Sequence, residues 1–245
     1  MSKAPVRVLR AFRYAVYFDG VDDYVDVKDI DVPALTLEAW AMLTASSWPS
    51  LGWRAILSKG FHTNVAGVGG LYVLSPTVYG GFLRDVYGNT YDVTASGLPS
   101  MLNTWHHIVL TSDGRLYVDG VLRKSVSIPN PVNLNDYRWQ VGRDPIEVRL
   151  YPGGRISVAR IYSRALSAEE VAHNYANPLN PVRNGLVLWL HAHPDNIKDV
   201  DGDGRLEWVD LSGFGNHGKM YGATLVEVVK SPARVLSPAR VVPTV

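Results

Sequence analysis

The sharpest chemical pattern in the sequence is an acidic segment over residues 199–210, DVDGDGRLEWVD. Carboxylates stand at its first, third, fifth and twelfth positions and glycine at its sixth, which is the spacing of a calcium-binding loop. Calcium takes roughly six to eight oxygen ligands, so we expect the carbonyl of the seventh residue and the ninth side chain to contribute as well. The expected ligands are Asp199, Asp201, Asp203, Arg205, Glu207 and Asp210.

Two features of this segment depart from the usual calcium loop. Its twelfth residue, Asp210, is shorter than the glutamate that normally closes the site with both carboxylate oxygens. The flanking residues have strand-like rather than helical patterns, so the loop would stand outside the paired-helix fold. The alternative is a solvated turn rich in aspartate and glycine. We predict a bound Ca²⁺ that stabilises a loop and takes no part in catalysis.

A second acidic cluster, formed by Asp19, Asp22 and Asp23, stands between two strand-like segments. Aspartate and glycine are also the residues that favour a tight turn. These residues alone leave both interpretations open, a turn and a second metal site.

The sequence contains no pattern typical of an enzyme. Glycosidases need two carboxylates at the scissile bond, and the six glutamates form no Glu-x-Asp-x-Glu pattern. No Gly-x-Ser-x-Gly elbow and no phosphate-binding glycine loop is present. The absence of cysteine excludes disulfides, thiol nucleophiles and zinc–cysteine sites. We therefore predict a protein that is not an enzyme.

Aromatic residues in turn-rich segments are the candidates for ligand binding. An exposed aromatic ring on a loop can stack on the apolar face of a sugar. The alternative is that these rings pack in the core or against another subunit. The candidates are Trp48, Trp53, Tyr87 and Tyr91.

Charge and hydropathy exclude two kinds of partner. The 24 basic and 23 acidic residues give a formal net charge of +1 and are scattered, so we expect no nucleic-acid binding. No apolar stretch approaches the roughly 18 residues that span a bilayer. The N-terminus is positively charged but lacks the apolar region of a secretory signal, so we expect either a missing signal or another route out of the cell. Scarce glutamine and absent cysteine are features shared with proteins of thermophiles.

Short alternating segments separated by turn signals dominate the chain, which predicts an all-β sandwich. Asp113-Gly114 and Asp119-Gly120 predict two tight turns that join three strands into a meander. One helix is predicted near residues 167–175, where Ser167 and Glu170 form a capping box. Prolines beyond this segment end the helix.

Five motifs, in order, resemble the laminin-G-like jelly-roll family of the concanavalin A-like lectin/glucanase superfamily. They are FDGVDDYV at 18–25, LEAW at 37–40, ILSKG at 56–60, WHHIV at 105–109 with LYVDG at 116–120, and RIYSRALSAEEV at 160–171. The resemblance implies a two-sheet antiparallel jelly-roll sandwich that binds ligands without catalysis. In related jelly rolls a structural calcium can sit near the turn at Asp19, but Ser157 stands here where the closing strand supplies an aspartate.

The C-terminal part presents a difference in order. Residues 185–223 resemble the segment that normally precedes the FDGVDDYV motif, yet here they come last. We divide the chain into a laminin-G-like core over 1–178 and an extension over 179–245. The extension completes the same sandwich as a permuted domain, belongs to one unit of a tandem array, or completes a neighbouring subunit. We favour completion within one chain, because a piece of this length cannot bury its own face.

Two functions follow from the resemblance and from this difference in order. The first is a lectin-like or adhesive module, extracellular or displayed on a surface, that binds glycans or surface proteins. The alternative is a structural subunit of a virion or of a cell-surface assembly, which self-assembles through its C-terminal strands.

Overall fold

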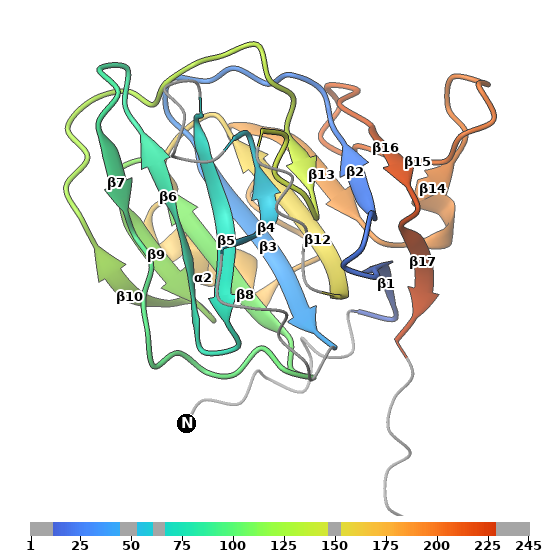
Figure 1. Cartoon of the computed structure of the whole chain (residues 1–245), viewed down its shortest axis with the longest axis horizontal. Coiled ribbons are helices and arrows are strands. Elements are labelled where there is room, and N and C mark those ends of the chain that lie inside the picture. Colours follow the sequence, from blue (N-terminus) through green and yellow to red (C-terminus); the bar gives the residue numbers. More distant parts are fainter. Residues whose placement is uncertain (1–11, 45–52, 61–66, 147–152, 229–245) are drawn as a thin grey trace, which may run out of the picture.

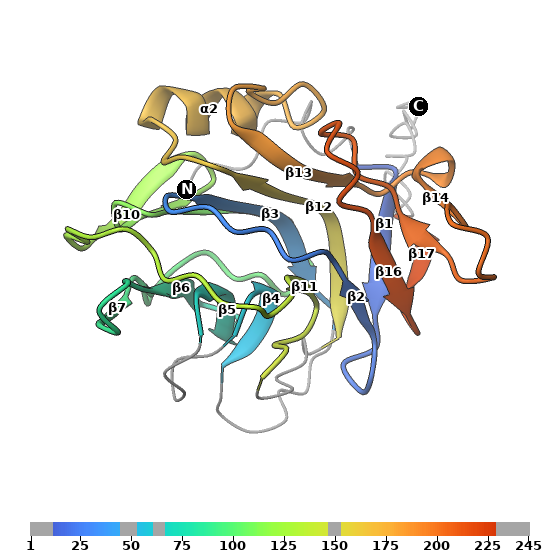
Figure 2. The same cartoon turned by 90° about the horizontal axis from the view of Figure 1, so that it is seen from above.

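A computed structural model describes residues 12–44, 53–60, 67–146 and 153–228 of the chain (Figure 1). Two antiparallel sheets lie face to face, and Figure 2 shows them as separate layers. Sheet A has the strand order β10 (Val121–Ser125), β9 (Arg115–Val118), β8 (His106–Thr111), β3 (Thr36–Leu43), β12 (Gly154–Tyr162), β1 (Tyr14–Phe18) and β17 (Thr224–Glu227), and β13 (Leu186–His191) also pairs with β12.

Sheet B is longer in the strand-to-strand direction. Its order is β14 (Ile197–Lys198), β15 (Glu207–Trp208), β16 (Gly218–Tyr221), β2 (Tyr24–Asp26), β11 (Gln140–Val141), β4 (Arg54–Ser58), β5 (Gly69–Ser75), β6 (Val78–Arg84) and β7 (Thr90–Asp92). The predicted two-sheet antiparallel sandwich is confirmed.

The local turn and helix predictions are confirmed as well. Strands β8, β9 and β10 form an antiparallel meander. Asp119 and Gly120 both have positive φ, as a tight hairpin turn requires. Helix α2 (Ala168–Ala176) begins after Ser167, which forms the capping box with Glu170. A short 3₁₀ turn, η1 (Pro194–Asn196), precedes β14.

The main core fills the space between the sheets and includes the enclosed rings of Trp139, Trp208 and Phe18. A second apolar layer covers the outer face of sheet A, where α2 lies (Figure 2). Trp40 in that layer stacks on Tyr175 of α2, with 5.6 Å between ring centroids. The helix therefore buries the outer face of sheet A and leaves the outer face of sheet B as the one without a described helix.

The strands that follow residue 185 pair with strands of the same chain. β13 pairs with β12, β16 with β2, and β17 with β1. The connection between α2 and β13 is attached to the helix, because the Asn174 side chain accepts a hydrogen bond of 2.8 Å from the Val182 amide. The division of the chain at residue 178 stays a prediction.

Candidate functional site

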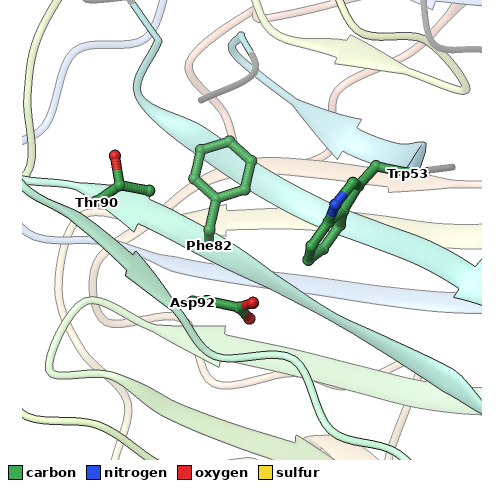
Figure 3. A pocket seen from close by; sticks show the side chains of 4 residues that line it. All are labelled: Trp53, Phe82, Thr90 and Asp92. Carbon is green, nitrogen blue, oxygen red and sulfur yellow. The ribbon is translucent and has the colours of Figure 1, made fainter. Parts of the chain in front are cut away.

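A depression of about 260 Å³ lies on the outer face of sheet B, near its β7 edge (Figure 3). Its lining residues are Trp53, Phe82, Thr90 and Asp92. Side chains alternate between the two faces of a strand. On β6, Leu83 belongs to the core while Phe82 belongs to a separate outer cluster with Tyr72 of β5. The strands thus place an aromatic cluster on the outer face of sheet B, apart from the core, and Trp53 is its partly exposed ring.

Three rings form the apolar part of this site. Tyr72 and Phe82 stack with 5.3 Å between centroids and an interplanar angle of 20°, and both are fully buried. The indole of Trp53 stands at 85° to Phe82 at 6.4 Å and at 89° to Tyr72 at 5.9 Å. A half-buried, upright tryptophan beside a flat aromatic floor gives a corner that fits the apolar face of a ring-shaped ligand.

The polar part of the site comes from β7. Thr90 and Asp92 are two residues apart on this strand, and therefore share a face. The Asp92 Oδ1 atom accepts a hydrogen bond of 2.7 Å from the Thr94 amide, which fixes the carboxylate. Its other oxygen has no protein donor among the residues that the structure describes. A carboxylate and a hydroxyl beside aromatic rings can accept and donate hydrogen bonds to sugar hydroxyl groups.

A buried network of hydrogen bonds fixes the Tyr72 ring of this aromatic cluster. The Tyr72 hydroxyl and the Ser58 hydroxyl each donate to Asp144 Oδ2 at 2.7 Å, and Ser58 also contacts the Tyr72 hydroxyl. Because Ser58 pairs with Asp144 and Tyr72 and no histidine base contacts it among the described residues, this arrangement positions a ring and does not resemble a nucleophilic triad.

The predicted ligand-binding aromatics separate in the structure. Trp53 lines the depression. Tyr87 is 77% exposed in the connection between β6 and β7, and Tyr91 donates its hydroxyl to Asp85 at 3.0 Å, so neither lines the depression. Trp48 lies outside the described residues.

Sequence reasoning did not identify Phe82, Thr90 or Asp92 as site residues. The available signal was the alternation within residues 78–84, which places Phe82 on the face opposite Tyr79 and Leu83. Which face of β6 is open to solvent depends on how the whole sheet packs. The sequence of β6 alone therefore does not identify the open face.

Three of the predicted calcium ligands gather in the structure. Asp199, Asp201 and Asp203 bring carboxylate oxygens within 4.8 Å of one another. Both oxygens of Asp199 accept backbone amide hydrogen bonds, from Gly202 at 2.7 Å and Gly204 at 2.8 Å. The carboxylates of this group are the hard oxygen donors that calcium prefers.

Two other predicted ligands, Glu207 and Asp210, lie apart from that group. Asp210 is buried, and its Oδ1 accepts the Trp189 amide at 2.9 Å while its Oδ2 accepts the Asn216 amide at 2.9 Å. Glu207 is buried in β15, and its carboxylate does not belong to the described gathering. Three carboxylates are fewer than calcium needs, so the residues as placed do not fit the ion well. The calcium site stays a prediction.

The second acidic cluster, Asp19, Asp22 and Asp23, also gathers its carboxylates within 4.8 Å. Asp23 Oδ2 accepts the Asp19 amide at 2.8 Å, and Asp19 Oδ1 accepts the Val21 amide at 2.7 Å. Burial raises the pKa of the Asp23 carboxyl. These contacts are those of a capped turn, and the metal interpretation stays a prediction.

Among the described residues no helix has the length and apolar character that crossing a membrane requires.

Comparison with solved structures shows the same fold in two proteins of low sequence identity. A protein from Bacteroides ovatus ATCC 8483, assigned a carbohydrate-binding role, matches with a TM-score of 0.63 and 19% identity over 88% of this chain and 60% of its own. The heptameric SAP-like pentraxin from Limulus polyphemus matches with a TM-score of 0.52 and 14% identity over 70% of this chain and 84% of its own. The chain thus spans three fifths of the Bacteroides protein.

Comparison with curated proteins finds no match. The family described as the concanavalin A-like lectin/glucanases superfamily matches residues 19–172. This range is more than half of the 245 residues and contains the strands that carry the depression. The chain belongs to the laminin-G-like family of the concanavalin A-like lectin/glucanase superfamily.

Proposed function

We propose that the protein is a non-catalytic, glycan-binding module, and that the sugar binds in the depression of sheet B. The observation that carries this proposal is that the upright Trp53 ring, Phe82, the Asp92 side chain and Thr90 line one depression, with Phe82 between Trp53 and Thr90 (Figure 3). A pyranose presents a patch of C–H groups for an aromatic ring and a rim of hydroxyl groups for polar acceptors.

The structural neighbours are compatible with this function. The Bacteroides protein of the same fold is assigned to carbohydrate binding. At 19% identity, the similarity between this chain and the Bacteroides protein shows a shared fold and no shared function. The argument for sugar binding therefore depends on the depression itself.

The location and the source of the ligand are part of the proposal. Glycans and surface proteins are presented outside cells, so we place the module in an extracellular or surface-displayed position. The alternative of a subunit of a virion or a cell-surface assembly predicts self-assembly through the C-terminal strands, and the oligomeric state of the chain tests it.

A glycan array probed with the labelled protein, followed by titration calorimetry on the best sugar, tests the proposal. Trp53→Ala should weaken binding at least about tenfold, which corresponds to about 1.4 kcal/mol of lost contact. Asp92→Asn keeps the oxygen that accepts the Thr94 amide and removes only the charge, and it should weaken binding by a smaller factor.

The matched control is Tyr87→Ala, which removes an exposed ring that does not line the depression. It should bind sugar as the wild type does. Loss of binding in Tyr87→Ala with retention in Trp53→Ala would move the site to the rim loops and refute the depression as the binding site.

A further inference from the structure

Lys219 stands in a row of charged side chains that crosses the outer face of sheet B. Lys198, Glu207, Lys219 and Asp26 are successive cross-strand partners on β14, β15, β16 and β2. Their neighbours along the strands, among them Trp208 and Met220, belong to the core, so these four residues lie on the face of the sheet away from the core, where Glu207 is nevertheless buried.

From this position the Lys219 side chain reaches the acidic loop. Its Nζ lies 2.7 Å from Asp201 Oδ2 and 2.6 Å from Asp203 Oδ2. These two carboxylates belong to the group of three that the calcium motif brings together. The ammonium therefore pairs with two of the three carboxylates that a metal ion at this loop would need.

A second cation fixes the end of the same loop. The Arg205 guanidinium lies over the Tyr221 ring at 4.3 Å, and Tyr221 stacks on Tyr24 at 4.5 Å with an interplanar angle of 1°. Tyr221 is two residues from Lys219 on β16, so both cationic contacts attach the loop to one strand.

We propose that Lys219 is the cation of this loop: its ammonium closes the acidic turn in the place that the motif assigns to calcium, and the loop folds without a metal ion. The positive charge that balances the aspartates of the loop thus comes from Lys219 of the chain itself. Asp199 accepts hydrogen bonds from two backbone amides, which complete the turn. The calcium loop inferred from spacing thereby becomes a salt-bridged loop at the β14–β15 edge, opposite the β7 edge that carries the depression.

Thermal melting of the wild-type chain in millimolar CaCl₂ and in EGTA is the first test. The expected result is the same melting temperature in both, and this measurement requires no variant to fold. A melting temperature that rises with calcium in the wild type would overturn the proposal.

Lys219→Met and Lys198→Met form the second test, since both remove a lysine from the same row. In EGTA, Lys219→Met should melt about 3 °C lower than the wild type, in the range of a small stability loss for a chain of this size. Lys198→Met should melt as the wild type does, because no ion pair of its side chain is found among the described residues. Equal melting temperatures for the two variants would also overturn the proposal.

Discussion

Glu38 and Arg160 form an ion pair that is fully enclosed between sheet A and the helix that covers it. Asn174 of α2 donates to the second Glu38 oxygen at 2.7 Å, and His107 lies 3.0 Å from the first. Arg160 also donates to the Pro178 carbonyl. Burial works to raise the pKa of the Glu38 carboxyl, but Arg160 and the hydrogen bonds from His107 and Asn174 lower it to about 2. One ionised carboxylate on β3 thus joins β8, β12 and the helix, and Arg160 links it to the connection toward the C-terminal strands.

Glu38→Gln should destabilise the protein strongly, because it leaves the Arg160 charge buried and uncompensated. The expected loss in the free energy of unfolding is about 3–5 kcal/mol, measured by urea denaturation. Glu170→Gln is the matched control, because Glu170 pairs with Arg164 in a partly exposed position and glutamine can keep the capping box. That loss should stay below about 1 kcal/mol. Equal losses in the two variants would contradict the assigned role of the buried pair.

His191 makes the stability of the fold depend on pH. Burial, together with the nearby charges of Arg160 and His193, lowers the pKa of His191 from 6.5 to about 4. The folded state therefore favours the neutral ring, whereas the unfolded state takes up a proton below pH 6.5. This contribution to stability is complete above pH 6.5 and is lost as the pH falls toward 4.

His191→Gln should remove that dependence. Between pH 6.5 and 5 the free energy of unfolding of the wild type should fall by at most about 1.4 kcal/mol per pH unit more than that of the variant. Urea denaturation at a series of pH values measures both slopes. Parallel slopes for the two proteins would show that His191 does not titrate between the folded and unfolded states as inferred.

Asp85 holds the β6–β7 connection together from inside. It is fully buried and accepts hydrogen bonds from the Tyr87 amide, the Asn89 amide and side chain, the Tyr91 hydroxyl and the Asn130 side chain, at 2.9–3.0 Å. Burial works to raise the pKa of its carboxyl, but the hydrogen bonds from Asn89, Asn130 and Tyr91 hold it well below its usual range. β7 begins directly after this cluster and carries the polar side of the depression.

Asp85→Ala should therefore weaken sugar binding although Asp85 does not line the depression. Amide hydrogen exchange over residues 85–92 should become faster, because the variant removes the acceptor of two backbone amides. Tyr87→Ala keeps its backbone amide on Asp85 and should leave both exchange and binding unchanged. Fast exchange without any loss of binding would show that β7 does not position the ligand.

Local chemistry explains why the fold could be predicted and the depression could not. The Asp119-Gly120 turn and the Ser167–Glu170 capping box are determined within a few residues, and the structure has both. The depression depends on the register that sets Phe82 opposite Asp92 and on the packing of Trp53 against β5 and β6. Such pairings join segments far apart in the sequence, so no single segment carries the signal.

The acidic loop also combines a local feature that the sequence predicts with a long-range contact that it does not. The spacing of the three aspartates predicted that their carboxylates gather, and the structure brings them together. Lys219 follows Asp203 by 16 residues, and its contact depends on the pairing of β15 with β16. A pattern that records only the acidic residues therefore omits the cation that the fold supplies.

The pairing of β17 with β1 within one chain can be tested covalently, because the sequence contains no cysteine. Tyr17 and Thr224 are direct cross-strand partners, so their Cα atoms stand about 4.5–5.5 Å apart, within the range that a disulfide bridges. Tyr17→Cys with Thr224→Cys, oxidised at low protein concentration, should run on a non-reducing gel as a monomer of the 27.0 kDa chain whose mobility changes on reduction. Light scattering of the wild type should give the same mass. Covalent dimers or longer ladders would show instead that β17 is donated to a neighbouring subunit, and would favour the assembly function over the binding module.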